Sequence, residues 1–422
     1  MSDSLLASLI FLLSYAAIIC FKHIKSQILW VGIGAGVLAG LIRTGSIFHD
    51  INWNVMGIFA GTLVLAEFFI LSRVPAVLAS YLVKRSSTVG SAFLGVCLLS
   101  SALSVFIENV AVVLIVAPIA FALARRINAS PVPAIVGIAI ASNLQGTATL
   151  IGDPPSMILA NYQHMNFNDF FIYKGKPGIF FAVEVGAIGA VTFLYYYFRR
   201  YKGSADVVSE EKIRSLAPTF FILLMVVALT LSSLVDPDFR WFGGTATMGC
   251  ALLCVIFCRF ASTSEKRGLG ARYDWATTMF LAGVFVMVGM LERAGVIDGF
   301  AHFLGRHIGT NPLVAFTAVV WGSVAFSSFV DNVPYLTAMI PVVQTMSRTM
   351  EVNIELLVFG LLIGACLGGN VTPVGASANV VATGMLRKNG YTISFWEFIK
   401  IGLPFTIIAT LLGAGFVYVI WG

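Results

Sequence analysis

The sequence predicts an all-α polytopic membrane protein made of two inverted-topology repeats. Hydrophobic residues make up 58% of the 422 residues, and charged residues only 11%. Apolar runs long enough to span a bilayer recur from one end of the chain to the other, and the second half repeats features of the first. Because these runs lack a period-two alternation, a transmembrane β-barrel is excluded.

Five membrane crossings, in chain order, are expected in each half. They cover residues 4–21, 28–44, 53–71, 132–162 and 177–198, and then 216–235, 241–258, 273–291, 353–386 and 401–421. Glycines and prolines interrupt the fourth crossing of each half, which is therefore predicted to be a broken helix. Residues 88–124 and 313–347 are expected to form re-entrant hairpins. The first run has no basic segment before it and no A-x-A site, so it is expected to be a retained helix rather than a signal peptide.

The distribution of basic residues predicts the orientation. With the N-terminus outside, 19 of the 26 Lys and Arg residues fall on the cytoplasmic side and 7 on the outer side. This is the positive-inside bias of a polytopic protein, here expected in the inner (plasma) membrane with both termini on the outer side. The formal net charge of +6 therefore needs no nucleic acid partner to explain it.

An internal repeat relates the two halves. SVFIENVAVVLIVAPIA (104–120) aligns with SSFVDNVPYLTAMIPVV (327–343), a shift of 223 residues, and further upstream a shift of 222 pairs Trp53 with Trp275. An odd number of crossings in each copy turns the second copy upside down, which is the layout of many secondary transporters. The chain is therefore divided into a first repeat (1–200), a polar cytoplasmic linker (201–215) and a second repeat (216–422), with no soluble domain.

Polar residues are concentrated in four segments within the membrane, namely the two hairpin tips and the two breaks. The candidate substrate- and ion-binding residues are Glu108, Asn109, Asn143, Gly146, Thr147, Thr149, Gly152, Asp153, Asp331, Asn332, Gly369, Asn370, Thr372, Gly375, Ser377 and Asn379. Backbone groups freed at the breaks can hold a cation or face an anion. Carboxylates within a membrane usually mark an ion or proton path, and none of the four segments contains Lys or Arg. Basic partners are therefore scarce, and Glu108 and Asp331 are expected to bind ions or protons, with an internal salt bridge or a helix cap as the alternative.

Other acidic residues have two interpretations each. Asp153 precedes two prolines, so it is either an ion-binding carboxylate or the N-cap of the half-helix that follows. Glu67 and Glu184 lie in apolar helices, where they are either functional acids or part of a helix or subunit interface.

Other chemistries find little support. Cys250, Cys254 and Cys258 share one helical face, where packing is expected rather than a thiol site for a metalloid. The histidines fall in or near loops without metal-ligand spacing. The sequence contains no HExxH, no Ser–His arrangement and no phosphate-binding loop, so no enzyme, metal or cofactor is expected. A soluble ATPase subunit stays open as a partner.

Three segments carry a family resemblance. NLQGTATLIGDPPSM, SSFVDNVPYLTAMIP and GACLGGNVTPVGASANVV resemble the signature segments of the ArsB/NhaD/P-protein branch of the ion transporter superfamily, the CitMHS-like permeases. The second-half segments are most similar to ArsB-like and P-protein members. The resemblance implies a homodimer in the lipid bilayer, in which a mobile transport domain moves against a scaffold as an elevator. It also implies that both hairpin tips and both broken helices form the site.

A more distant similarity is to the dicarboxylate/sodium symporters, whose hairpin tips carry Ser-Asn-Thr. Glu108 and Asp331 stand where those serines would be, and paired carboxylates repel a dicarboxylate. The expected function is therefore a secondary active transporter, coupled to H⁺ or Na⁺, that exports a small inorganic solute.

Arsenite or antimonite is the first expected solute, because neutral As(OH)₃ is not repelled by acids and its hydroxyls can bond Asn, Thr and Ser. A Na⁺/H⁺ antiporter is the alternative, and an anion channel or a dicarboxylate carrier is a further one.

Overall fold

The computed structural model describes residues 2–21, 24–126, 129–203, 212–261, 273–308 and 311–422. The described chain is helical apart from a two-stranded hairpin of β1 (Ile172–Tyr173) and β2 (Lys176–Pro177). Most of the predicted linker 201–215 lies outside the described residues, as do the basic residues Lys22, Lys266, Arg267 and Arg272 counted for the orientation.

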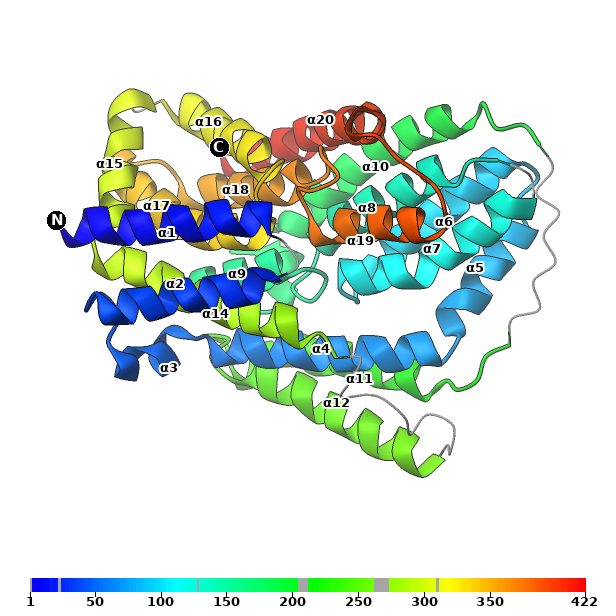
Figure 1. Ribbon diagram of the computed structural model, residues 1–422, viewed down its shortest axis with the longest axis horizontal. Coiled ribbons are helices and arrows are strands. Elements are labelled where there is room, and N and C mark those ends of the chain that lie inside the picture. The colour runs from blue at the N-terminus through cyan, green and yellow to red at the C-terminus, as the bar shows by residue number, and fades with distance from the viewer. Residues whose placement is uncertain (1, 22–23, 127–128, 204–211, 262–272, 309–310) are drawn as a thin grey trace.

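Within the described chain, seven helices are long and apolar enough to cross a membrane. They are α1 (Asp3–Cys20), α4 (Trp53–Leu71), α10 (Ile179–Phe198), α11 (Ala217–Val235), α12 (Phe242–Ala261), α14 (Trp275–Arg293) and α20 (Phe395–Trp421). In Figure 1 most of the long helices run along the horizontal axis of the view. This confirms a multi-pass helical membrane protein.

The predicted interruptions in the remaining apolar segments are confirmed. The first hairpin consists of α6 (Val89–Ser104) and α7 (Asn109–Arg126), and the second of α16 (Pro312–Ser327) and α17 (Asn332–Met350). The first break separates α8 (Val132–Gly146) from α9 (Pro154–Gln163), and the second separates α18 (Ile354–Gly368) from α19 (Ser377–Lys388). Each hairpin and each broken helix thus presents two helix ends at one interruption.

Three elements differ from the prediction. The crossing expected over 28–44 is α2 (Lys25–Leu38), whose 14 residues span about 21 Å. The chain turns soon after it, because Gly40 takes a φ of +76° that favours glycine. Two short helices, α5 (Val74–Lys84) and α15 (Val296–Ile308), occupy segments expected to be loops. Both helices are short, with 11 and 13 residues, so neither contains the long apolar run that predicts a membrane crossing.

Short elements complete the described chain. They are the 3₁₀ turn η2 (Thr44–Ser46), the single turn α3 (Ile47–Asp50) and the 3₁₀ turn η3 (Asn168–Phe170).

The starts of several helices recur at the offset found in the sequence. Helices α4 and α14 begin 222 residues apart, at 53 and 275, and so do α5 and α15, at 74 and 296. Helices α7 and α17 begin 223 residues apart, at 109 and 332, as do α9 and α19, at 154 and 377. Corresponding segments of the two halves therefore form the same type of element.

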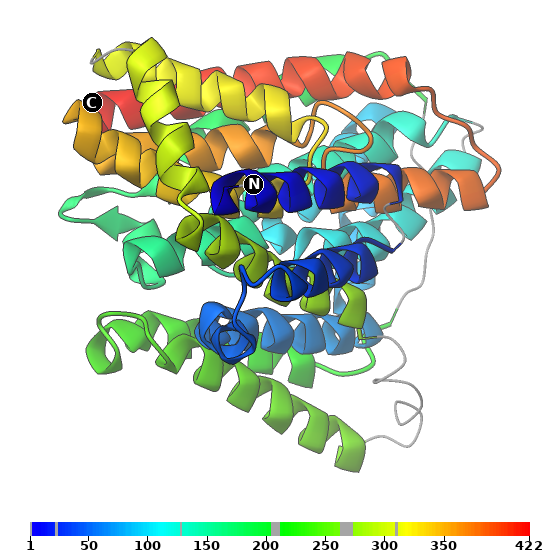
Figure 2. The ribbon, with the colours of Figure 1, turned by 60° about the vertical axis from the view of Figure 1, so that its left-hand side comes forward.

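The helices pack in two groups. Helices α1, α2, α4, α11, α12 and α14, here called the framework helices, pack mainly on one another: α4 on α12, α12 on α11, and α14 on α2. Helices α6–α10 and α16–α20, here called the hairpin helices, pack α6 on α8, α16 on α18 and α10 on α20. Figure 2 shows α11 and α12 at one side of the molecule and α16 and α20 at the other. Helices α5 and α15 connect the two groups along the chain.

Candidate functional site

A small cavity lies between the two groups, and six helices begin at its wall. These helices are α2, α7, α9, α14, α17 and α19. The residues around the cavity at these helix starts are Lys25, Glu108, Asn109, Asp153, Pro154, Asp274, Asp331, Asn332, Ala376 and Ser377. The first N–H groups of a helix have no partner within it and carry partial positive charge, so they stabilise negative charge nearby. The architecture thus offers a place in the protein interior where carboxylates can remain ionised.

The first hairpin tip places Glu108 against its own backbone. The residue is 8% exposed, and its Oε2 accepts a hydrogen bond from the Ala111 N–H at 3.1 Å. Asn109 donates from Nδ2 to Oδ1 of Asn143 on α8, at 2.8 Å. This tip therefore holds a buried acid beside an amide that ties α7 to the first broken helix.

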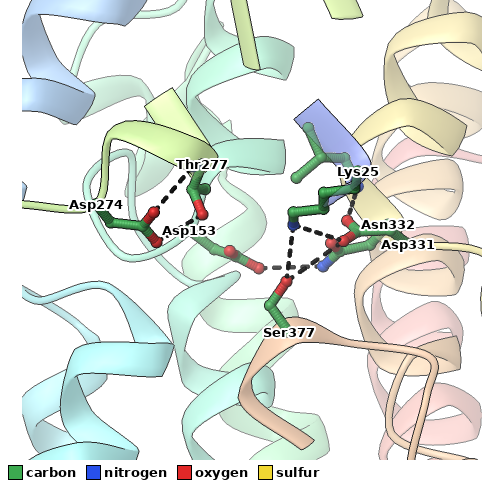
Figure 3. A network of polar contacts seen from close by, with 8 residues as sticks. Lys25, Asp153, Asp274, Thr277, Asp331, Asn332 and Ser377 are labelled. Carbon is green, nitrogen blue, oxygen red and sulfur yellow. Dashed lines mark hydrogen bonds and ion pairs between the residues drawn. The ribbon is translucent and has the colours of Figure 1, made fainter. Parts of the chain in front are cut away.

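The second tip is more open and holds a basic partner. Asp331 caps α17 by accepting a hydrogen bond from the Val333 N–H at 3.2 Å. Its Oδ2 lies 3.5 Å from Nζ of Lys25 and accepts a hydrogen bond from Oγ of Ser377 at 3.3 Å. Lys25 also donates to Ser377 Oγ at 3.4 Å, so the three groups form a triangle (Figure 3).

Asp153 links the first break to the second tip. It occupies the N-cap position of α9, yet its side chain makes no capping hydrogen bond. It accepts a hydrogen bond from Nδ2 of Asn332 at 3.2 Å instead, and it lines the cavity beside Glu108 and Asn109. Of the two interpretations of Asp153, the geometry favours a carboxylate of the site. The position equivalent to Asp153 at the second break is Ala376, so this acid has no counterpart.

Three buried amides form a layer behind the cavity. Asn143 donates from Nδ2 to Oδ1 of Asn370 at 2.8 Å and to Oδ1 of Asn379 at 3.1 Å. Asn379 in turn donates to the carbonyls of Gly369 and Thr372, at 2.8 and 3.0 Å. Because all three side chains are fully buried, these mutual bonds satisfy polar groups that would otherwise destabilise the fold. They also connect the two broken helices.

The glycines of the breaks allow backbone to touch backbone. A Cβ on Gly152 would lie 2.5 Å from the Ser104 carbonyl oxygen and 2.6 Å from that of Gly146. A Cβ on Gly375 would lie 2.6 Å from the carbonyl oxygen of Gly369 and 2.8 Å from that of Ser328. In each break, the backbone at the glycine lies so close to the start of the same break and to the neighbouring hairpin that no side chain fits there.

Threonines fasten each break to its hairpin. Thr149 donates to the Val105 carbonyl at 2.5 Å, and Thr372 donates to the Ser328 carbonyl. Thr147 donates to the Asn143 carbonyl at 3.1 Å and so closes the end of α8. These predicted site residues hold the breaks in place and do not line the cavity.

The predicted candidates therefore divide into two sets. Those that line the cavity are Glu108, Asn109, Asp153, Asp331, Asn332 and Ser377. Those that support it from behind are Asn143, Gly146, Thr147, Thr149, Gly152, Gly369, Asn370, Thr372, Gly375 and Asn379.

Two charged residues of the site were missed by the sequence analysis. At Asp331 the alternative of a salt bridge and a helix cap is observed, because Lys25, which was predicted to lie in a cytoplasmic loop, is its basic partner. Lys25 is the first residue of α2, and this helix directs the ammonium into the site. Asp274 caps α14 and lines the cavity. The repeat could have indicated Asp274, since it precedes Trp275, the counterpart of Trp53.

The remaining acids and the cysteines lie elsewhere. Glu67 lines a second cavity together with Glu108 and Asp274, beside α7. Glu184 on α10 accepts a hydrogen bond from Gln145 of α8, so it supports the first broken helix from outside the cavity. Cys250, Cys254 and Cys258 are buried on α12, a helix that packs on both α4 and α11.

The charges around the cavity favour cations. Among the residues that the structure places there, four are acids, namely Glu108, Asp153, Asp274 and Asp331, and one, Lys25, is basic. An anion would meet an excess of negative charge, whereas a monovalent cation or a proton would reduce it. The described residues hold no group of three or more His, Cys, Asp or Glu side chains arranged to bind a metal ion.

Comparison with known proteins identifies the family. The profile of the CitMHS family, described as citrate transporters, matches residues 15–364, which is most of the chain. The chain belongs to the CitMHS family. Membership makes it a secondary transporter and not an enzyme.

Relatives in the family align over nearly the whole chain. An uncharacterized transporter of Mycobacterium tuberculosis is 28% identical over 423 residues, covering 98% of each protein. A 46 kDa membrane protein of Mycobacterium leprae is 29% identical over 420 residues, covering 97% of each. The human P protein is 25% identical over an alignment of 487 positions, which covers 94% of this chain and 58% of the P protein. The P-protein similarity expected from the sequence is thus confirmed, whereas a particular closeness to ArsB-like members stays a prediction.

A solved structure shares the fold. The YdaH transporter of Alcanivorax borkumensis superposes with a TM-score of 0.61 over 99% of this chain and 98% of its own, at 14% identity. At that identity the similarity shows the architecture alone.

Proposed function

We propose that the protein is a cation/proton antiporter in which Na⁺ and H⁺ compete for the carboxylates of the cavity. The observation that supports it most is the excess of four acids over one base at a place where six helices begin. Helix N-termini favour negative charge on nearby carboxylates, and a carboxylate within a membrane can hold either a hard cation or a proton. Exchange of the two at a shared site couples their gradients.

Export of arsenite or antimonite is the second candidate. Ser377, Asn332 and Asn109 line the cavity and offer neutral donors and acceptors for the hydroxyls of As(OH)₃. Arsenite ranks below a cation because Asn143, Asn370 and Asn379, which were also expected to bind the solute, already form hydrogen bonds with one another. A dicarboxylate ranks lower still, since the four acids would repel it.

The transport cycle that we propose is an elevator in a homodimer. The recurring helix starts support two repeats, and the odd number of crossings predicted from the sequence for each repeat would make the second copy inverted. The framework helices would form the fixed scaffold and the hairpin helices the moving block, with the cavity between them. Both termini would lie on the outer side of the plasma membrane, as the excess of basic residues on the other side favours.

Flux through proteoliposomes tests the function. Purified protein is reconstituted into liposomes that have an acidic lumen and contain a trapped pH-sensitive dye. NaCl, LiCl, KCl, arsenite, silicate or a dicarboxylate is then added outside. Saturable dequenching by Na⁺ or Li⁺ without arsenite is expected. Dequenching that requires arsenite would favour the second candidate. Current that does not saturate and depends on no counter-ion would indicate a channel and overturn the proposal.

A further inference from the structure

Lys25 fills a position that resembles a cation site. Its Nζ lies 3.5 Å from Oδ2 of Asp331 and 3.4 Å from Oγ of Ser377, and it stands 4.5 Å from the ring centre of Phe280. A carboxylate, a hydroxyl and an aromatic face are the groups that surround a bound monovalent cation. The ammonium therefore occupies space and ligands that a transported cation would use at this acid.

The two partners belong to different groups of helices. Lys25 is carried by the framework helix α2, whereas Asp331 and Ser377 are carried by the hairpin helices α17 and α19. The contact therefore links the two parts of the molecule whose relative position would have to change in an elevator. Figure 3 shows Lys25 reaching across to Asp331 and Ser377.

The pair is accessible enough to be exchanged. The side chains of Lys25 and Asp331 are 18% and 21% exposed, while Glu108 is 8% and Asp153 3% exposed as whole residues. Ion pairs that water can reach contribute little net free energy, because solvation replaces much of the attraction. A cation or a proton at Asp331 can thus compete with the lysine.

We propose that Lys25 is a resident counter-cation of Asp331, and that a cation or proton must displace it to occupy this carboxylate. Displacement removes the ionic link between the framework and the hairpin helices and so permits their relative movement. This inference rests on the proposed exchange of cations at the cavity. The other charged groups that face the pair are Asp153 from the first break, Glu108 from the first hairpin and Asp274 from the start of α14. Because all three groups are acids, departure of the lysine is easier when another cation or a proton takes its place.

Direct binding of ²²Na⁺ in detergent tests the competition. At one fixed pH, Lys25→Met should lower the half-saturating Na⁺ concentration by about tenfold, because an apparent affinity rises when a competing state is removed. Lys25→Arg keeps a cation and should stay near the wild-type value. Lys84→Met, at the exposed end of α5, is the control for loss of a lysine at a helix end. A half-saturating concentration unchanged in Lys25→Met would overturn the proposal.

A second measurement is independent of transport. Reductive methylation quantified by mass spectrometry reports how available each lysine amine is. In Asp331→Asn, labelling of Lys25 relative to Lys84 should rise several-fold, and in the wild type it should rise as Na⁺ replaces choline. Equal labelling of Lys25 in the wild type and Asp331→Asn would show that the pair does not form and would overturn the proposal. If wild-type liposomes show no cation exchange while the Asp331→Asn labelling rises, the pairing stands and the proposed function fails.

Discussion

The two hairpin tips are related by the repeat, yet their acids lie in different surroundings. Glu108 is buried and accepts a hydrogen bond from the backbone of its own helix α7. Asp331 caps α17 in a similar way but also faces Lys25 and Ser377. The repeat in the sequence places an acid at each tip. The residues that surround the two tips differ, so the two acids have different partners.

Under the proposed cation exchange, this difference would give the two halves of the site separate tasks. An acid without a lysine can take up a cation or proton directly, whereas an acid with a lysine must first lose it. Asp153 adds to the inequality, because it accepts from Asn332 of the second tip and has Ala376 as its counterpart. Variants that act on one tip and spare the other can test this division.

The largest effect is expected from neutralising the first tip. Glu108→Gln should lower Na⁺-driven proton flux by a hundredfold or more. A bound cation would lose a buried carboxylate as its partner, which costs about 3 kcal/mol, and each 1.4 kcal/mol is a factor of ten. Flux in proteoliposomes, with protein amount and monodispersity checked, provides the measurement. If Glu108→Gln transports normally with an unchanged pH profile, the acid is structural and the comparison of the tips fails.

The tip asparagines should have the next largest effect. Asn332→Ala removes a hydrogen bond to the Asp153 carboxylate, which contributes about 1.5–3 kcal/mol, and Asn109→Ala removes an amide that lines the cavity and holds Asn143. Binding should weaken, so the half-saturating Na⁺ concentration should rise by about tenfold or more, while the number of protons exchanged per cation should not change. Asn109→Ala should also destabilise the fold, because it leaves Asn143 without one donor. A change in stoichiometry with unchanged affinity would contradict this assignment.

The breaks should respond alike, in contrast to the tips. Gly152→Ala and Gly375→Ala would each place a Cβ within 2.8 Å of two carbonyl oxygens, and overpacking of this kind costs about 1–3 kcal/mol. Both variants should lower the midpoint of thermal unfolding in detergent. Gly249→Ala is the matched control, since a Cβ there meets no atom within 4 Å. Strong destabilisation by only one of the two would show that the breaks, too, are unequal.

The smallest effect is expected from the ion pair itself. A double-mutant cycle of Lys25→Met and Asp331→Asn should give a coupling free energy of about 1 kcal/mol or less in unfolding, because the pair is partly exposed. Chemical denaturation in mixed micelles is the measurement. A coupling of several kcal/mol would mean that the pair is a fixed structural link rather than an exchangeable one.

Much of the site could be predicted from the sequence because its parts are local. A hairpin tip or a break appears as adjacent Gly, Pro, Asn and acidic residues inside an apolar run, and the repeat shows which of them correspond. The local pattern and the repeat together predicted that Glu108, Asp331 and both breaks belong to the site. The sequence also left Asp153 with two interpretations, which depended on where its side chain points.

The rest depended on tertiary packing. Lys25 lies more than 300 residues from Asp331, and nothing near it in the chain distinguishes it from other basic residues at a cytoplasmic end. The supporting role of Asn370 and Asn379 likewise appears only when the two broken helices lie together. Helices α5 and α15 were missed because short helices lack the long apolar run used to find crossings.

The meeting of six helix starts at one cavity has a consequence for the evolution of selectivity. The partial positive charge of these N-termini is a property of the backbone and stays when side chains change. With acids at the tips, the local field is negative and suits a cation. With serines at the same two positions, the backbone would be left to favour an anion. A transporter of this architecture could therefore change the sign of its substrate through very few substitutions, without any change of fold.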